Sequence, residues 1–554
     1  MSPSQPTLQE ESAHVFHEIL LNDARLALPA KVHELAKRTV FDSLTIPTPY
    51  IPVPLKVTES SAALWALAAT YANAIVRERY AIEQSVTVNT DLASLFLVSG
   101  LVARVDGKPL TDADLAARYS AYDLGHIFER WRFNCTNVYP TRDGRFFHLH
   151  GSLNSDKTLT MMKLPLHRPE MTDEMEIIQE YCKAVSQHDS QWLDVEANEH
   201  WRQAGTICLT PDEFHASEQG KAIANDAIYS LEQVDKHIIP PVPYASGGQA
   251  NKYRPLEGVK ILDISRVIAA PTISKLAALY GATVLRVSCA SEPELGLLLV
   301  DGNLGKLDTS INLKSTEGKS QFLELLQDAD VVIDGYRPGA LDKLGFGSRY
   351  LQEIAKRRQK GIVILRENCY GWHGPHAHRS GWQQISDCFT GVSWLVGRFF
   401  GLDEPVVPPL PNSDYQTGII GLIGILAAVD RRANEGGSYL VNVSLNQYNQ
   451  FLLSLGEYPE ETQAALRAQH QDLKLRHYHT IFTATQKMIV SLQSSVPSLF
   501  KNSNWGNIDS DFHKEGGILE KLTYVLPPTT FDKTKPAYDV GSCFPGTHEP
   551  RWPW

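Results

Sequence analysis

Residues 259–288, VKILDISRVIAAPTISKLAALYGATVLRVS, decide the fold, because two short apolar stretches flank a segment with helical periodicity. The same alternation continues along the chain. Strands are predicted at 259–265, 282–288, 329–336 and 360–368, and helices at 271–281 and 317–327. Short apolar strands that alternate with helices predict an α/β fold with a doubly wound, Rossmann-like parallel sheet. Neither GxGxxG nor GxxxxGK[ST] follows the first strand, so we expect no dinucleotide site and no P-loop.

The composition is that of a soluble globular protein with more than one domain. The chain has 554 residues, of which 43% are hydrophobic and 21% charged, so about two to four domains are expected. A net charge of -11 gives no basic surface for nucleic acid, and no apolar run reaches the ~18 residues of a membrane span. The seven cysteines form no CxxC pair and the N-terminus is polar and acidic, which favours a cytoplasmic location.

An internal repeat relates two distant parts of the chain. When the two parts are aligned without a gap, VTVN at 86–89 falls on VNVS at 441–444, each after a long apolar helical pattern. In this register Glu59 stands opposite Asp414. Acidic residues also match by chance at helix starts, where Asp and Glu are enriched.

Asp414 is the leading candidate for chemistry. It follows the Pro-rich loop PPLPNS and precedes an apolar run at 418–429, which places it at or near a helix N-terminus. Backbone N–H groups and the helix dipole there favour the ionised carboxylate. A carboxylate that is held ionised and half desolvated can act as a nucleophile toward an activated acyl group. The alternative is a helix cap without a chemical role.

Other polar clusters suggest further sites. Arg337 and Lys343 lie in and after DGYRPG, at the carboxyl end of a predicted strand, where open α/β sheets bind ligands. They could hold phosphates, or they could be a solvated basic pair. His373, His376 and His378 share a Gly/Pro loop that has no carboxylate or thiolate at ligand spacing, so we predict no metal site.

Five segments carry a resemblance to a known family. Within 255–450 they read PLEGVKILDISRVIAAPTISKLAALYGATVLRV, NLGKLDTSINLKSTEGK, ADVVIDGYRPGALDKLGFG, GPHAHRSGW and SDYQTGIIGLIGILAAVDRR, in that order. This half resembles the N-terminal half of the family III CoA-transferases, the superfamily of formyl-CoA transferases, carnitine CoA-transferases and α-methylacyl-CoA racemases. Residues 48–238 resemble the later half of the same family, and the segments PPTTFDKTKP and PGTHEP resemble its C-terminal tail.

The resemblance implies that the chain is a fused, partly eroded tandem copy. The expected division is an N-terminal helical packing segment (1–47), an eroded first copy (48–238) with a small α+β domain (137–238), a linker (239–256), a Rossmann-like CoA-transferase domain (257–450), and a shortened small domain with a tail (451–554). Because family members form interlocked homodimers, we expect either an intrachain pseudo-dimer or a homodimer.

The resemblance also implies a site. In the transferases of this family, the aspartate at the position of Asp414 attacks an acyl-CoA. A mixed anhydride and then an aspartyl-CoA thioester form before a carboxylic acid takes the CoA. Coenzyme A or acyl-CoA would be a substrate, with no tightly bound cofactor. Candidate CoA contacts are Arg286, Arg337, Lys343, Arg379, Ile268 and Ala269, and candidate substrate contacts are Trp382, Tyr415 and Glu59.

The chain departs from the family pattern at several positions. Ile268 stands where the transferases often have Gln, and Ser288 and Cys289 replace a Glu-Arg pair whose Arg holds a CoA phosphate. Trp382 replaces a catalytic His of the racemases, and no Gly-rich loop that would cover the intermediate is evident. Two alternatives to CoA transfer follow. One is isomerisation, elimination or cyclisation of a bulky acyl substrate with Asp414 as the base, and the other is a binding protein without catalysis.

Overall fold

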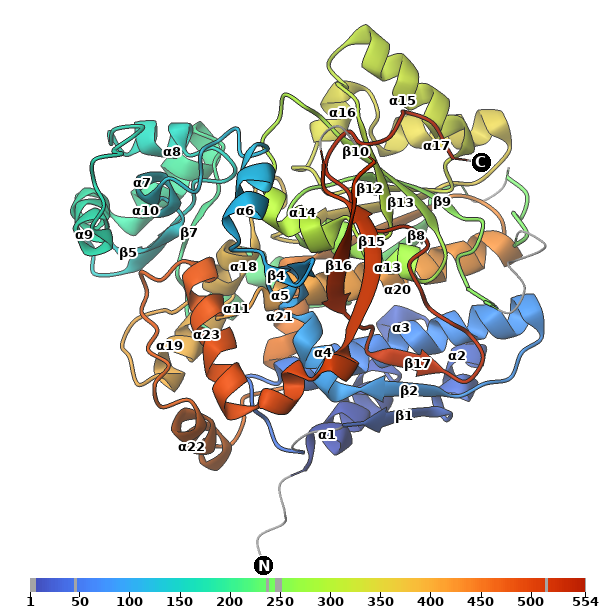
Figure 1. The fold of residues 1–554 in the computed structure, drawn as a ribbon, viewed down its shortest axis with the longest axis horizontal. Coiled ribbons are helices and arrows are strands. Elements are labelled where there is room, and N and C mark those ends of the chain that lie inside the picture. The colour runs from blue at the N-terminus through green and yellow to red at the C-terminus, as the bar shows by residue number, and fades with distance from the viewer. Residues whose placement is uncertain (1–5, 44–46, 236–238, 245–251, 514–516, 554) are drawn as a thin grey trace, which may run out of the picture.

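A seven-stranded sheet organises the computed structural model, which describes residues 6–43, 47–235, 239–244, 252–513 and 517–553 (Figure 1). The strand order is β11-β10-β9-β12-β13-β14-β8, and every neighbouring pair is parallel except β14 and β8. The bounds are β8 (Tyr229–Gln233), β9 (Lys260–Ile264), β10 (Thr283–Ser288), β11 (Lys306–Ser310), β12 (Val331–Asp334), β13 (Val363–Asn368) and β14 (Tyr439–Ser444). The predicted doubly wound parallel sheet is confirmed.

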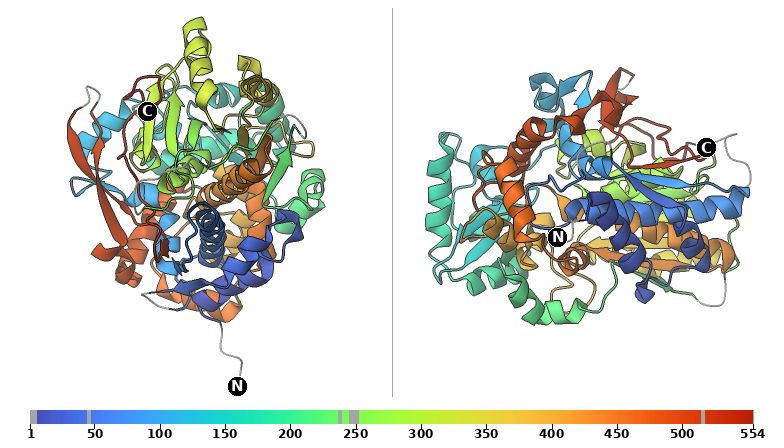
Figure 2. Two further views of the ribbon diagram at one scale, coloured as in Figure 1. Left: turned by 90° about the vertical axis from the view of Figure 1, so that its right-hand side faces the viewer. Right: turned by 90° about the horizontal axis from the view of Figure 1, so that it is seen from below.

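Helices cover both faces of this sheet (Figures 1 and 2). They are α13 (Ala269–Leu279) and α20 (Asn412–Asn434) on one face, and α15 (Thr316–Asp328) and α17 (Ser348–Arg358) on the other. Successive residues of a strand face opposite sides, so Ile261 belongs to the core around α13 and α20, whereas Leu262 belongs to the core around α15 and α17. Burial on both faces explains why the strands are continuously apolar rather than alternating.

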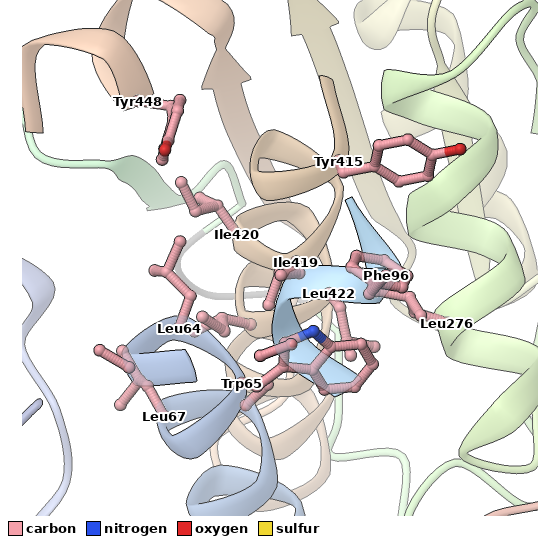
Figure 3. Close-up of a cluster of buried hydrophobic side chains, with 14 of the residues drawn as sticks. Leu64, Trp65, Leu67, Phe96, Leu276, Tyr415, Ile419, Ile420, Leu422 and Tyr448 are labelled. Carbon is pink, nitrogen blue, oxygen red and sulfur yellow. The ribbon is translucent and has the colours of Figure 1, made fainter. Parts of the chain in front are cut away.

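Two long helices, α20 and α3 (Val57–Tyr80), pack against each other (Figure 3). Every residue of α3 from Val57 to Val76 is buried. Leu64, Trp65 and Leu67 of this helix lie in the same cluster as Ile419 and Leu422 of α20. A helix that is apolar on all sides must be buried on all sides, and α3 meets this requirement by packing between α20 and the N-terminal helices.

Glycines bring α20 close to α13. A Cβ atom at Gly418 would lie 2.4 Å from the Cγ2 atom of Thr272, and one at Gly421 would lie 2.4 Å from the Cδ1 atom of Ile273. Larger residues would therefore push the two helices apart. Since α20 carries Asp414 and α13 begins beside it, this close approach positions the candidate site.

The two segments of the predicted repeat have the same order of elements. Helix α3 is followed by β2 (Val86–Asn89) and α4 (Thr90–Phe96), and helix α20 is followed by β14 and α21 (Leu445–Ser454). The residues before the two long helices share one backbone conformation, with φ -77° and ψ 58° at Lys56 and φ -78° and ψ 59° at Pro411. The origin of the chain from a duplication stays a prediction.

The predicted small domain forms a separate cluster (upper left in Figure 1). Its sheet has the order β5-β6-β7, and a turn at 142–144 joins β5 to β6. The elements are α7 (Arg130–Phe133), β5 (Asn137–Pro140), β6 (Phe146–Leu149), α8 (Asp156–Met161), α9 (Glu174–Val185), α10 (Ser190–Val195), a π-helix (Glu196–His200) and β7 (Gly205–Ile207).

Strands from distant parts of the chain pair with each other. A three-stranded sheet has the order β1-β2-β17 and a four-stranded sheet the order β15-β16-β3-β4, so the last hundred residues pair with the first half of the chain. The bounds are β1 (Thr39–Asp42), β3 (Arg104–Val105), β4 (Lys108–Pro109), β15 (Trp505–Asp511), β16 (Leu519–Val525) and β17 (Thr529–Phe531). The predicted boundaries stay a prediction, and 245–251 of the predicted linker lies outside the described residues.

The remaining elements surround these sheets. The α-helices are α1 (Leu8–His14), α2 (Ala30–Ala36), α5 (Ser99–Val102), α6 (Ala113–Ser120), α11 (Pro211–Ala216), α12 (Glu218–Ile223), α14 (Gly296–Gly302), α16 (Ala340–Leu344), α18 (Gln383–Phe389), α19 (Val392–Phe399), α22 (Glu460–Gln469) and α23 (Ile481–Ser495). A π-helix (Val15–Leu20) and 3-10 helices (Ala24–Leu26, Pro497–Phe500, Asn502–Asn504) complete the set. Within the described ranges, no helix combines the length and apolarity needed to cross a membrane.

Candidate active site

Asp414 lies where two cavities meet. The larger, which we call the polar cleft, has a volume of about 750 Å³ and follows the carboxyl ends of β9, β12 and β13. Its charged and aromatic lining includes Arg266, Glu292, Lys314, Tyr336, Arg337, Glu367 and Arg379. The smaller, which we call the apolar pocket, has a volume of about 100 Å³. Its lining includes Leu101, Ile127, Phe133, His150, Leu295, Leu298, Gln384, Tyr415, Ile481 and Phe482.

Six residues line both cavities and define their junction. They are Ser152, Leu153, Val267, Ile268, Trp382 and Asp414. Asp414 stands in the first turn of α20, and Val267 and Ile268 precede α13. Val267 has a φ of 76°, which is strained for a β-branched residue and costs about 1–3 kcal/mol. Strained backbone of this kind clusters at functional sites, and here it lies at the start of α13, at the same junction as Asp414.

The environment of Asp414 favours the protonated acid rather than the carboxylate. Burial, followed by the charges of Glu367 and Asp387, raises the pKa of Asp414 well above its ordinary value. The prediction that the helix N-terminus keeps Asp414 ionised is therefore wrong, because the dipole contributes only about 0.3–1 kcal/mol. The alternative of a helix cap is also wrong, since no side chain caps α20.

Two further carboxyl groups lie near Asp414. Glu367, at the end of β13, lines the polar cleft, and burial followed by the charge of Asp334 raises its pKa to about 8. Asp387 is fully buried in α18, and burial raises its pKa to about 7 although Asn449 Nδ2 donates a hydrogen bond to its Oδ1 (2.9 Å). The sequence reasoning missed both groups. The position of Glu367 after the apolar part of a parallel strand was the signal available for it.

Arg266 and Arg337 supply positive charge to the polar cleft. The guanidinium of Arg266 lies 5.0 Å from the ring centroid of Tyr336. The side chain of Arg337 is exposed to the cleft. Desolvation by the residues around it, followed by the charge of Arg266, lowers the pKa of Arg337. Two like charges that face the same space favour an anion between them. Arg337 was predicted, whereas Arg266, directly after the first strand of the sheet, was missed.

Two predicted cationic contacts already have internal partners. Arg286 is buried, and its Nη1 and Nη2 atoms pair with Asp308 Oδ2 (2.6 Å) and Glu294 Oε1 (2.5 Å). Arg379 lines the polar cleft, but Asp194 (3.0 Å) and Glu199 (2.9 Å) neutralise its guanidinium. The structure thus corrects the expectation that either side chain is free for a phosphate, since a buried guanidinium takes the nearest internal carboxylates.

The other predicted contacts divide into two groups. Ile268, Ala269 and Trp382 line the polar cleft, and Tyr415 lines the apolar pocket, where its hydroxyl accepts a hydrogen bond from the backbone N–H of Gly100 (2.9 Å). By contrast, neither cavity is lined by Lys343, which lies on α16, or by Glu59, which is buried in α3.

Glu59 and the histidine cluster have partners of their own. Tyr458 donates its hydroxyl to the carboxylate of Glu59, whose two oxygens lie 2.7 and 2.8 Å away, and burial raises the pKa of Glu59 to about 7. His373 contacts Asp226 (3.0 Å) and His378 contacts Glu199 (2.9 Å), so these histidines do not converge. Among the described residues, no group of three His, Cys, Asp or Glu side chains is arranged to hold a metal ion.

Comparison with known proteins places this chain in a family. The sequence profile of CoA-transferase family III matches residues 256–502. The chain is 36% identical to the acetyl-coenzyme A transferase nodX of Hypoxylon pulicicidum, over 100% of this chain and 94% of that protein. It is 29% identical to an acyl-CoA transferase of Gibberella moniliformis, over 72% of this chain and 71% of that protein.

A solved structure also aligns with part of the chain. The crystal structure of Rv3272 from Mycobacterium tuberculosis in its orthorhombic form covers 53% of this chain and 98% of its own, with 20% identity and a TM-score of 0.38. The family assignment rests on the sequence relatives. Since the Hypoxylon protein is 36% identical over nearly its whole length, this chain belongs to CoA-transferase family III and is an enzyme of the CoA-transferase type.

Proposed function

We propose that the protein transfers CoA from an acyl-CoA to a carboxylic acid, with Asp414 as the nucleophile. One observation carries this proposal, namely that Asp414 lies at the junction of a large polar cleft and a small apolar pocket. An acyl-CoA has the same two-part character, because the long polar CoA lies on one side of the thioester carbonyl group and the acyl chain lies on the other. If each part occupies the matching cavity, the carbonyl carbon lies beside the Asp414 carboxylate.

Each cavity supports its part of the assignment. Arg337 offers charge for the phosphates of CoA along the polar cleft. Arg266 and Lys314 share one carboxylate, that of Glu292, at 3.9 and 2.6 Å, so this group of three side chains keeps one net positive charge in the cleft. The apolar pocket is lined in part by Phe133 and Phe482, whose ring centroids lie 5.9 Å apart. At about 100 Å³ it suits a short or compact apolar acyl group, since a cavity of about 150 Å³ lined by similar side chains binds benzene.

The reaction would proceed through covalent intermediates on Asp414. An oxygen of the ionised carboxylate attacks the thioester carbon, the C–S bond breaks, and CoA leaves as the thiolate. The thiolate then attacks the Asp414 carbonyl carbon of the mixed anhydride, releases the first acid, and forms an aspartyl-CoA thioester. The acceptor carboxylate repeats these two steps in reverse, so that the new acyl-CoA leaves and the Asp414 carboxylate is regenerated.

The raised pKa of Asp414 fits this role. A carboxylate in a dry site is poorly solvated and is therefore more reactive once its proton has left. The nearby acid Glu367, with a pKa of about 8, stays protonated near neutral pH and is therefore available as an acid, rather than as a base, beside the reaction. The same raised pKa also supports a second candidate, in which Asp414 is a base that removes a proton next to the thioester carbonyl group.

Substitution of Asp414 by Asn tests both candidates. Asp414→Asn is expected to abolish CoA transfer from acetyl-CoA to a panel of carboxylic acids, whereas Asp403→Asn, a matched change at an exposed residue, is expected to keep full activity. Unchanged transfer in Asp414→Asn would reject the nucleophile. Exchange of the α-hydrogens of the acyl-CoA with deuterated water in the absence of an acceptor acid would favour the base.

We also propose that the two halves of one chain replace the two subunits of the family dimer. In support, Ser152 and Leu153 from the first half line both cavities together with Asp414 from the second half. A single chain thus provides both sides of the site. Light scattering is expected to give the mass of one chain, and the mass of a dimer at all concentrations would contradict the proposal.

A further inference from the structure

His150 brings an imidazole into the apolar pocket that Asp414 also lines. It follows β6 of the small domain, and only 5% of its surface is exposed. Its ring stacks on the ring of Trp382, with centroids 5.3 Å apart and planes 6° apart. A second contact is made with His148, at 5.6 Å between centroids and an angle of 29°. These two contacts fix the plane of the His150 ring.

The hydrogen bonds of His150 determine which nitrogen carries the proton. The backbone N–H of Ser152 donates to His150 Nδ1 (2.9 Å), so this nitrogen is the acceptor. Ser152 has a φ of 55°, and this left-handed turn brings its N–H back to a ring two residues earlier. Burial lowers the pKa of His150 well below its ordinary value, so the ring is neutral. The proton of a neutral ring with Nδ1 as acceptor lies on Nε2.

The Nε2–H group is therefore an uncharged donor in the pocket. The side chain of Gln384 lines the same pocket as His150. A substrate oxygen that enters the pocket can accept this hydrogen. Ile268, which lies at the junction with Asp414, carries no side-chain donor that could serve the same purpose.

We propose that His150 is a further catalytic residue, whose Nε2–H donates a hydrogen bond to the thioester carbonyl oxygen while Asp414 attacks the carbonyl carbon. This inference rests on the proposed function. In the step, the Asp414 oxygen bonds to carbon, the carbonyl oxygen takes up the negative charge and returns it, and the C–S bond breaks with departure of the CoA thiolate. His150 keeps its proton throughout, because it is a donor and not an acid. Removal of one such donor typically costs about 10²–10³-fold in kcat.

Two variants separate the hydrogen bond from the packing of the ring. His150→Phe keeps an aromatic ring for the stack on Trp382 but removes the donor, and is expected to lower kcat by about 10²–10³-fold with little change in KM. His150→Gln places an amide N–H near the position of Nε2, and is expected to recover activity to within about tenfold of the wild type. Equal losses in the two variants, or a loss confined to KM, would overturn the proposal.

A spectroscopic test does not depend on turnover. Acetyl-CoA labelled with ¹³C at the thioester carbonyl is bound to Asp414→Asn, and the carbonyl stretch is measured by difference infrared spectroscopy. A hydrogen bond from His150 is expected to lower this frequency relative to free acetyl-CoA, and the shift is expected to disappear in Asp414→Asn/His150→Phe. A band at the frequency of free acetyl-CoA while His150 is present would overturn the inference. If Asp414→Asn retains full transfer activity, the proposed function fails instead.

Discussion

Replacement of Glu367 by Gln is expected to change how stability depends on pH. In the folded protein the pKa of Glu367 is raised from 4.5 to about 8, first by burial and then by the charge of Asp334. As the pH rises above 4.5, Glu367 ionises in the unfolded chain while it stays protonated in the folded protein. The unfolded state is favoured, and stability is lost progressively up to about pH 8. The amide of the Glu367→Gln variant cannot ionise, so the variant lacks this loss.

The magnitude follows from the size of the pKa change. A rise from 4.5 to about 8 corresponds to about 5 kcal/mol for a group sealed from water. Glu367 borders the polar cleft, where water screens part of the charge, so we expect about 2 kcal/mol. The free energy of unfolding of Glu367→Gln should thus exceed that of the wild type by about 2 kcal/mol more at pH 8 than at pH 5.

Urea unfolding at pH 5, 6, 7 and 8 measures this difference. Glu324→Gln, a matched change at an exposed residue of α15, serves as the control and is expected to follow the wild type at every pH. The reasoning would be refuted if the difference in free energy of unfolding between Glu367→Gln and the wild type stayed constant from pH 5 to pH 8. A constant difference would mean that Glu367 ionises alike in the folded and unfolded states.

Two further predictions concern the polar cleft and the central helices. Arg266→Ala and Arg337→Ala should each weaken CoA binding about tenfold and reduce its salt dependence, because each removes a charge from the cleft, while Lys343→Ala should bind like the wild type in calorimetric titrations. A loss in Lys343→Ala as large as in the arginine variants would contradict this assignment. Gly421→Ala should lose about 1–3 kcal/mol in urea unfolding because its Cβ would lie 2.4 Å from a side-chain carbon of α13, whereas Gly302→Ala, with open space around it, should lose nothing. Equal stability of the two glycine variants would contradict the close helix packing.

The sequence predicted the parts of the fold that depend on local pattern. The strands at 259–265 and 282–288 and the helix between them are confirmed within about two residues, because each is apolar and bounded by turn residues. Short strands such as Arg104–Val105 were not predicted. The Asp106-Gly107 turn that joins β3 to β4 was the local signal available for them. The pairing of β3 with β16, far along the chain, leaves no local periodicity.

The site was predicted in part, because local sequence pattern locates some of its residues. Asp414 and Arg337 stand at element ends that the sequence pattern locates, and both line the cavities. Arg286 also belongs to a predicted strand, but its partners Asp308 and Glu294 come from other segments, so only the folded chain shows that its charge is neutralised. His150 enters the pocket from a different half of the chain, which no spacing rule near Asp414 could indicate.

The account depends most on the covalent role of Asp414. Incubation with acetyl-CoA and hydroxylamine, followed by mass analysis of peptides, tests this role directly, since hydroxylamine converts an aspartyl anhydride or thioester to a stable hydroxamate. We predict a hydroxamate on the peptide that contains Asp414, dependent on acetyl-CoA and absent from Asp414→Asn. An unmodified Asp414 peptide from enzyme that is transferring CoA at its normal rate would contradict the account.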